Sequence, residues 1–133
     1  MQIQGVEIIK VYTFEESSVS FRSDGLVWVC IKTSNDVEIK HVVEIVGALE
    51  DYGKGKKYPL LITTPKFTLP NAKARAYIAT AESDPFASAE AYVIQSFSQK
   101  LVGNSFLQFN KPARPTRIFS SEEKAIEWLK SFL

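Results

Sequence analysis

The hydrophobic period changes near Lys32, and this change most constrains how the chain can fold. Before it, the segments VEIIKVYTF and SVSF are rich in β-branched and aromatic residues, which favour strands. Asp24-Gly25 stands between SVSFRS and LVWVCIK, where it predicts a two-residue hairpin with a type I′ turn. After Lys32, helical spacing places one set of apolar residues on a common face: Ile39, Val42, Val43, Val46 and Leu49.

The ends of this first helix also carry signals. Asn35 is expected to cap it, with Glu38 three residues on in capping-box position. Gly53 is expected to close the helix in the left-handed conformation, which glycine adopts at little cost. The sequence therefore predicts antiparallel strands followed by a capped amphipathic helix.

Short apolar segments and helical segments then alternate to the end of the chain. YPLLITT, AEAYVIQS and TRIF predict strands. Helices are predicted over LPNAKARAYIATAE with Asn71 as cap, from Ser96 or Ser98 to about Phe109, and over SEEKAIEWLKSFL with Ser120 and Glu123 as a capping box. No repeat or linker interrupts the order. We predict one α/β domain over residues 1–133, with N-terminal antiparallel strands followed by βα units whose helices pack on a mostly parallel sheet.

Composition excludes several classes of function. The 16 basic and 15 acidic residues nearly balance, which argues against a nucleic-acid partner. The single cysteine, Cys30, and the single histidine, His41, are too few to hold a structural zinc ion, and His41 is expected on the polar face of the first helix as a surface residue. No segment resembles a signal peptide or a membrane span. We expect a cytoplasmic protein with no cofactor and no metal.

Several segments together resemble a known family. They are the Asp24-Gly25 hairpin, KKYPLLI, AKARAYIA and VGNSFLQFNKPARPTRIFSSEEKAIEWL, in the strand and helix order given above. This combination is similar to small bacterial STAS-like domains, also described as SpoIIAA-like or anti-sigma-factor-antagonist-like, which are related to CRAL-TRIO domains. The C-terminal segment resembles the uncharacterised branch of this family. The resemblance implies a regulatory or protein-interaction role.

In the classical antagonists, a serine or threonine at the start of the helix after the central strand is phosphorylated. Here that helix start reads Leu69, Pro70 and Asn71, so the phosphorylation motif is absent. The segment TPKFTLPN still links a central strand to a helix, at the edge where open α/β sheets bind ligands and partners. Its candidate partner-binding residues are Thr64, Phe67, Thr68 and Asn71. Phe67 is either a core anchor or an exposed contact.

A second candidate surface follows the fourth predicted helix. Lys111, Arg114 and Arg117 surround Pro112 and Pro115, and stiff loops of this kind can present cations to an anion or an acidic partner. The alternative is a solvated loop without a ligand.

We therefore predict a non-enzymatic regulatory or interaction module with an unknown protein partner. One alternative is a small domain that binds an apolar or lipid-like ligand between its sheet and helices, and a second is a cryptic enzyme. Aromatic residues in FLQF, together with Trp128 and Phe132, leave a homodimer open as well.

Overall fold

The computed structural model describes residues 5–133, which form one mixed sheet with helices on both faces. The sheet has six strands in the order β1-β2-β3-β4-β5-β6. Their bounds are Ile8–Thr13, Ser17–Arg22, Val27–Ile31, Tyr58–Thr63, Ala87–Val93 and Thr116–Phe119. The pairs β1–β2 and β2–β3 are antiparallel, and the pairs from β3 to β6 are parallel. The predicted α/β fold is confirmed.

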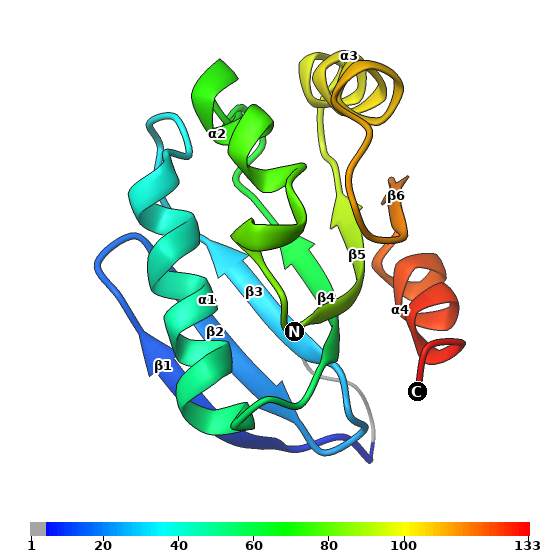
Figure 1. Ribbon diagram of the computed structural model, residues 1–133. Coiled ribbons are helices and arrows are strands. Elements are labelled where there is room, and N and C mark those ends of the chain that lie inside the picture. Colours follow the sequence, from blue (N-terminus) through cyan, green and yellow to red (C-terminus); the bar gives the residue numbers. More distant parts are fainter. Residues whose placement is uncertain (1–4) are drawn as a thin grey trace.

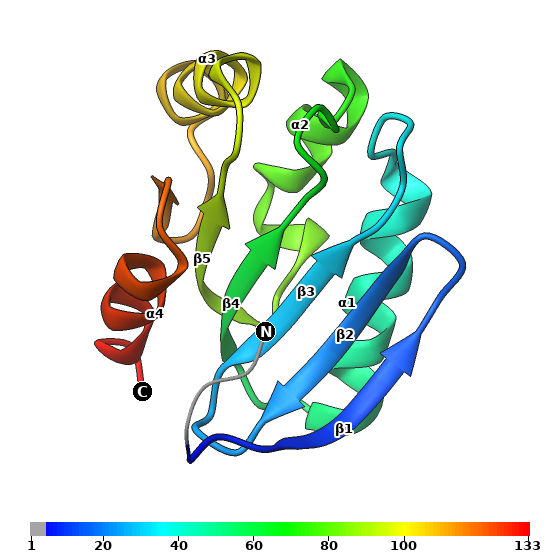
Figure 2. The same ribbon diagram turned by 180° about the vertical axis from the view of Figure 1, so that it is seen from behind.

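Helices α1 (Ile39–Gly53) and α2 (Ala72–Ile78) cover one face of the sheet, as Figure 1 shows. The short helix η1 (Ala81–Ser83) leads from α2 to β5. Helix α3 (Phe97–Ser105) and the π-helical turn η2 (Phe106–Asn110) lie beyond the carboxyl end of β5, and α4 (Glu122–Lys130) packs on the opposite face, as seen from behind in Figure 2. Within residues 5–133, no helix has the length and apolar character needed to cross a bilayer.

Each face of the sheet has its own apolar core. On the α1 side, the fully buried side chains include Val19, Phe21 and Leu49. On the α4 side, Leu26, Leu61 and Leu129 are 0% exposed. Alternate residues of the central strands therefore enter opposite cores, which explains why the three successive residues Leu60, Leu61 and Ile62 are all apolar.

The β2–β3 hairpin forms, but its turn is not type I′. A type I′ turn needs positive φ at both central residues, whereas only Gly25 in this loop has positive φ, at 92°. The Gly25 N–H donates to the Arg22 carbonyl at 3.1 Å, and the Arg22 N–H donates to the Leu26 carbonyl at 3.0 Å. These two hydrogen bonds define a loop that is longer than two residues. In it, a tight turn is followed by Gly25 in the left-handed conformation. Asp24 instead accepts hydrogen bonds from the Arg22 side chain.

The face that helix α1 presents to the core overlaps the predicted one, since Leu49 is buried and Val42 and Val46 are half-buried, but it is rotated from it. Its buried residues are His41, Ile45, Ala48 and Leu49, while Val43 is 54% exposed. Apolar residues occupy a wider stripe of the helix surface than the sheet covers. Spacing alone therefore does not show which side of this stripe is buried. The ends also differ from expectation: Glu38 is the N-cap, and Lys54, at φ 50°, takes the left-handed position.

The predicted N-caps of α2 and α3 are confirmed, and that of α4 is wrong. Asn71 caps α2 by accepting the Ala74 N–H at 2.8 Å, and Ser96 caps α3. For α4 the N-cap is Ser121, which accepts the Lys124 N–H at 3.3 Å, and not Ser120. The predicted capping box was wrong because the helix begins one residue later than the first serine suggested.

Candidate functional site

The carboxyl ends of the parallel strands form the edge on which the candidate site lies. Here the β4–α2 loop meets the first turn of α3, and buried Gln99 joins them. Its Nε2 lies 3.1 Å from Thr64 Oγ1, 2.7 Å from the Pro65 carbonyl and 2.9 Å from the Thr68 carbonyl. Because a single amide holds the loop at three points, the exposed residues between these points sit on a fixed support.

Three of the four predicted partner-binding residues hold this loop in place. Thr64 accepts from Gln99, Thr68 is 4% exposed and donates to the Thr33 carbonyl at 2.7 Å, and Asn71 caps α2. Phe67 differs, because it is 75% exposed. Of the two alternatives for this residue, the structure shows the exposed one.

Other apolar side chains project from neighbouring segments of the same edge. Phe97 and Leu101 on α3 are 72% and 55% exposed, and Phe109 on η2 is 72% exposed. We call Phe67, Phe97, Leu101 and Phe109 the aromatic edge. The segments that carry these residues lie at one end of the molecule (Figure 1), and exposed apolar side chains that form a contiguous patch mark contact surfaces.

The charge of these segments has one sign. No Asp or Glu occurs in residues 52–81 or 91–121, and the same ranges carry exposed lysines: Lys66, Lys73, Lys100 and Lys111. The Lys66 ammonium lies over the Phe67 ring, 5.4 Å from the ring centroid. Acidic Asp36 and Glu38 lie on the neighbouring β3–α1 loop, which borders the edge where Val37 bridges to Pro70. The edge is therefore basic, with acidic residues at one border.

The three cations of the predicted anion patch do not share a surface. Lys111 is exposed at the end of η2. Arg117 is exposed on the α4 side, where its guanidinium lies 5.3 Å from the Phe119 ring centroid and 5.6 Å from that of Trp128. Arg114 is 8% exposed, so its charge is not available on the surface. Proline-flanked spacing predicted proximity, but β6 starts within this segment and separates the side chains.

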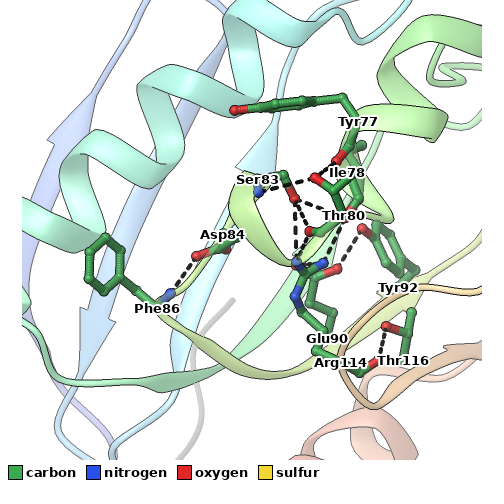
Figure 3. Close-up of polar contacts among 10 residues, drawn as sticks. All are labelled: Tyr77, Ile78, Thr80, Ser83, Asp84, Phe86, Glu90, Tyr92, Arg114 and Thr116. Atoms are coloured by element: carbon green, nitrogen blue, oxygen red, sulfur yellow. Dashed lines mark hydrogen bonds and ion pairs between the residues drawn. The ribbon is translucent and has the colours of Figure 1, made fainter.

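Arg114 instead organises a buried polar cluster, drawn in Figure 3. Its Nη1 donates to the Ile78 carbonyl at 2.8 Å, and its Nη2 donates to the Thr80 carbonyl at 2.7 Å. These carbonyls lie at the C-terminal end of α2, where a cation is favoured by the helix dipole. Arg114 Nη1 also lies 3.7 Å from Glu90 Oε2, so one guanidinium joins α2, β5 and the segment before β6.

Glu90 is the least expected member of this cluster, because it is a carboxyl group 4% exposed in a central strand. Burial raises its pKa to about 7, against the attraction of Arg114, and the charge of Asp84 raises it further. The Tyr92 hydroxyl donates to Glu90 Oε1 at 2.9 Å. Burial and the Glu90 carboxyl keep the pKa of Tyr92 well above its ordinary value, and burial also raises the pKa of Asp84. One buried guanidinium thus pairs with Glu90 and also acts on the charge of Asp84.

A cavity of about 130 Å³ lies beneath α2, bounded by α1, α3 and the helix-covered face of the sheet. Its apolar lining includes Val46, Leu60, Ile62, Ile78, Val102 and Phe106. Both Asp84 and Glu90 line the cavity, together with Tyr92. One feature of the sequence indicates this site: the charged residue Glu90 interrupts an otherwise apolar strand segment, AEAYV.

His41 is not a surface residue, contrary to the prediction. It is 3% exposed, its Nδ1 accepts the Glu38 N–H at 2.9 Å, and its Nε2 pairs with Glu16 Oε2 at 2.5 Å. Thr33 donates to the other Glu16 oxygen, and these hydrogen bonds hold the pKa of Glu16 below its ordinary value. The group connects the β1–β2 turn to the start of α1, and it is a structural contact.

Residues 20–133 match the model of a family described as a domain of unknown function, DUF7793. The chain belongs to the DUF7793 family. No curated protein matches this DUF7793 chain.

A solved structure shares the fold of this DUF7793 domain. It is an uncharacterised protein of the DUF3478 family with a SpoIIAA-like fold, from Shewanella loihica PV-4. The two are 16% identical, the alignment covers 97% of each chain, and the TM-score is 0.50. At this identity the likeness establishes the fold alone. The STAS-like architecture inferred from sequence is therefore confirmed, and the function rests on the residues of the site.

Proposed function

We propose that this DUF7793 domain is a non-enzymatic regulatory module that binds an acidic protein partner through the aromatic edge. The observation that carries the proposal is the exposure of three phenylalanine rings, each above 70%, on segments free of Asp and Glu. Exposed rings supply apolar contact area, and the surrounding lysines favour a partner of opposite charge.

The support beneath the edge fits this role. Gln99 fixes the β4–α2 loop against α3, so little conformational entropy is lost when Phe67 and Phe97 become buried against a partner. A pre-ordered surface of this kind binds without the ordering cost of a mobile loop.

The test compares Phe67→Ser with a matched control, Val43→Ser, which changes an apolar residue 54% exposed on α1. Wild-type protein is used to capture partners from native cells, and each captured protein is identified, purified and measured by calorimetry. We expect Phe67→Ser to weaken binding about thirtyfold, since an aromatic hot spot contributes about 2 kcal/mol or more. The control should bind like the wild type.

Two results would contradict the proposal. One is a purified partner that binds both variants equally. The other is a thermal midpoint lowered by several degrees in Phe67→Ser, because an exposed contact residue should leave folding stability nearly unchanged. Sedimentation of the wild-type protein over a range of concentrations shows whether the partner is a second copy of this chain, and self-association through the edge would replace the acidic partner.

A further inference from the structure

We propose that the cavity beneath α2 binds a compact organic cation, an amine or guanidine attached to an apolar body the size of one ring, with Glu90 and Asp84 receiving the charge. This site lies below the surface of the aromatic edge, and the inference does not depend on a partner binding there.

The size of the cavity limits the ligand. A cavity of about 130 Å³ is slightly smaller than one of about 150 Å³ that accepts benzene. Drug-sized ligands occupy pockets of about 300 Å³ or more. The apolar lining therefore fits one aromatic or branched aliphatic group.

The charges on the wall select the sign of the polar group. Asp84 and Glu90 both line the cavity, whereas Arg114 lies behind them and is held by the carbonyls of Ile78 and Thr80. One guanidinium cannot balance two ionised carboxyls in a buried setting, so the cluster lacks one positive charge when both are ionised. A ligand ammonium group beside Glu90 supplies that charge.

One further charged residue lines the cavity and must be accounted for. Arg75 is half-buried on α2, and its Nη1 donates to the Pro70 carbonyl at 2.7 Å. This bond directs the guanidinium toward the N-terminal end of α2, while Asp84 follows the C-terminal end. Seven helical residues separate the ends by about 10 Å. The two ends of the cavity therefore differ in charge, and the cation belongs at the Glu90 end.

Cation binding and Glu90 ionisation are linked. Without ligand, Glu90 holds a proton at low pH, and the Asp84 and Arg114 charges then balance. A bound ammonium favours the ionised carboxyl, so Glu90 must release its proton before or during binding. With a pKa of about 7, the ionised fraction rises about tenfold between pH 6 and pH 8.

The experiment uses four probes with the same ring: benzylamine, benzyl alcohol, toluene and benzoate. Binding to the full chain is measured by calorimetry and NMR at pH 6 and pH 8. We expect benzylamine to bind more tightly than benzyl alcohol at pH 8, to gain about tenfold in affinity from pH 6 to pH 8, and to lose that gain in Glu90→Gln. Benzoate should not bind.

Two α1 variants test the location. Val46→Phe fills the cavity from its lining and should abolish binding of benzylamine, whereas Val43→Phe, on the exposed side of the same helix, should not. If Glu90→Gln does not fold, the ¹³C shift of the Glu90 carboxyl in wild-type protein reports the same event, because benzylamine should move it toward the carboxylate value at pH 6.

Three outcomes would overturn the proposal: no binding of any probe, equal affinity for benzylamine and benzyl alcohol at pH 8, or benzylamine binding that survives Val46→Phe. None of these results tests the aromatic edge. If the cavity does not bind the cation, the proposed partner binding is still decided by the Phe67→Ser experiment.

Discussion

Replacement of Glu90 by glutamine should change how the stability of this protein depends on pH. In the unfolded chain a glutamate titrates near 4.5, whereas in the folded protein burial raises the pKa of Glu90 to about 7. Between these values the folded state holds a proton that the unfolded state has released, so the free energy of unfolding falls as pH rises. At about 1.4 kcal/mol for each pKa unit, the loss amounts to roughly 3 kcal/mol by pH 8.

Two other carboxyls with shifted pKa values, those of Glu16 and Asp24, add little to the pH dependence of stability between pH 5 and pH 8. The pKa values of Glu16 and Asp24 lie below their ordinary values, so the stability they contribute is present above pH 5 and is lost only as pH falls further. Asp84 has a raised pKa and acts in the same direction as Glu90. Because the Asp84 charge also raises the Glu90 pKa, the difference between the two proteins reports the titration of Glu90 together with its coupling to Asp84.

Urea denaturation at intervals from pH 5 to pH 8 measures this difference. We expect the wild type to lose stability across the range and Glu90→Gln to lose much less, since glutamine keeps an oxygen for the Tyr92 hydroxyl and has no proton to release. Glu82→Gln, an exposed carboxyl on η1, is the control and should follow the wild type. Parallel curves for the wild type and Glu90→Gln would refute the reasoning, because they would mean that Glu90 titrates at the same pH in both states.

Two further predictions concern the packing and capping of the helices. Ser121→Ala should lower the free energy of unfolding by about 1 kcal/mol because it removes the α4 N-cap, while Ser120→Ala should not; equal effects in urea denaturation would place the helix start elsewhere. Gly103→Ala should cost no more than about 1 kcal/mol, because the added Cβ meets the Cδ1 tip of Ile118, which can turn away, and because alanine favours the helix more than glycine does. Adding Ile118→Val should recover part of that loss, and a simple sum of the two single effects would show that the side chains do not meet.

Sequence patterns predicted the fold well because its main signals are local. Apolar segments such as YPLLIT and TRIF became strands, and Asn71 and Ser96 became caps, since a strand's alternation and a cap's hydrogen bond involve neighbouring residues. The errors arose where tertiary packing chose among similar local options. His41 became buried because Glu16, 25 residues earlier, offers it a partner.

The candidate site was less accessible to sequence reasoning. Phe67 could be located on the ligand-binding edge, but its exposure depends on Gln99 holding the loop from another element. The Glu90 and Arg114 pair joins β5 to the segment before β6, and neither residue lies in a recognisable motif. Such a cluster exists only once distant segments meet.

The order of the strands also affects how the chain folds. Each strand pairs with the strands that precede and follow it in sequence, from β1 through β6, so every connection joins two neighbouring strands. The sheet can grow from any adjacent pair by adding one neighbour at a time, and each addition closes only the loop or helix between them. Low separation between pairing partners lowers the entropic barrier to folding. This topology also places β1 and β6 on opposite edges, so the central strands β2 to β5 are each paired on both sides.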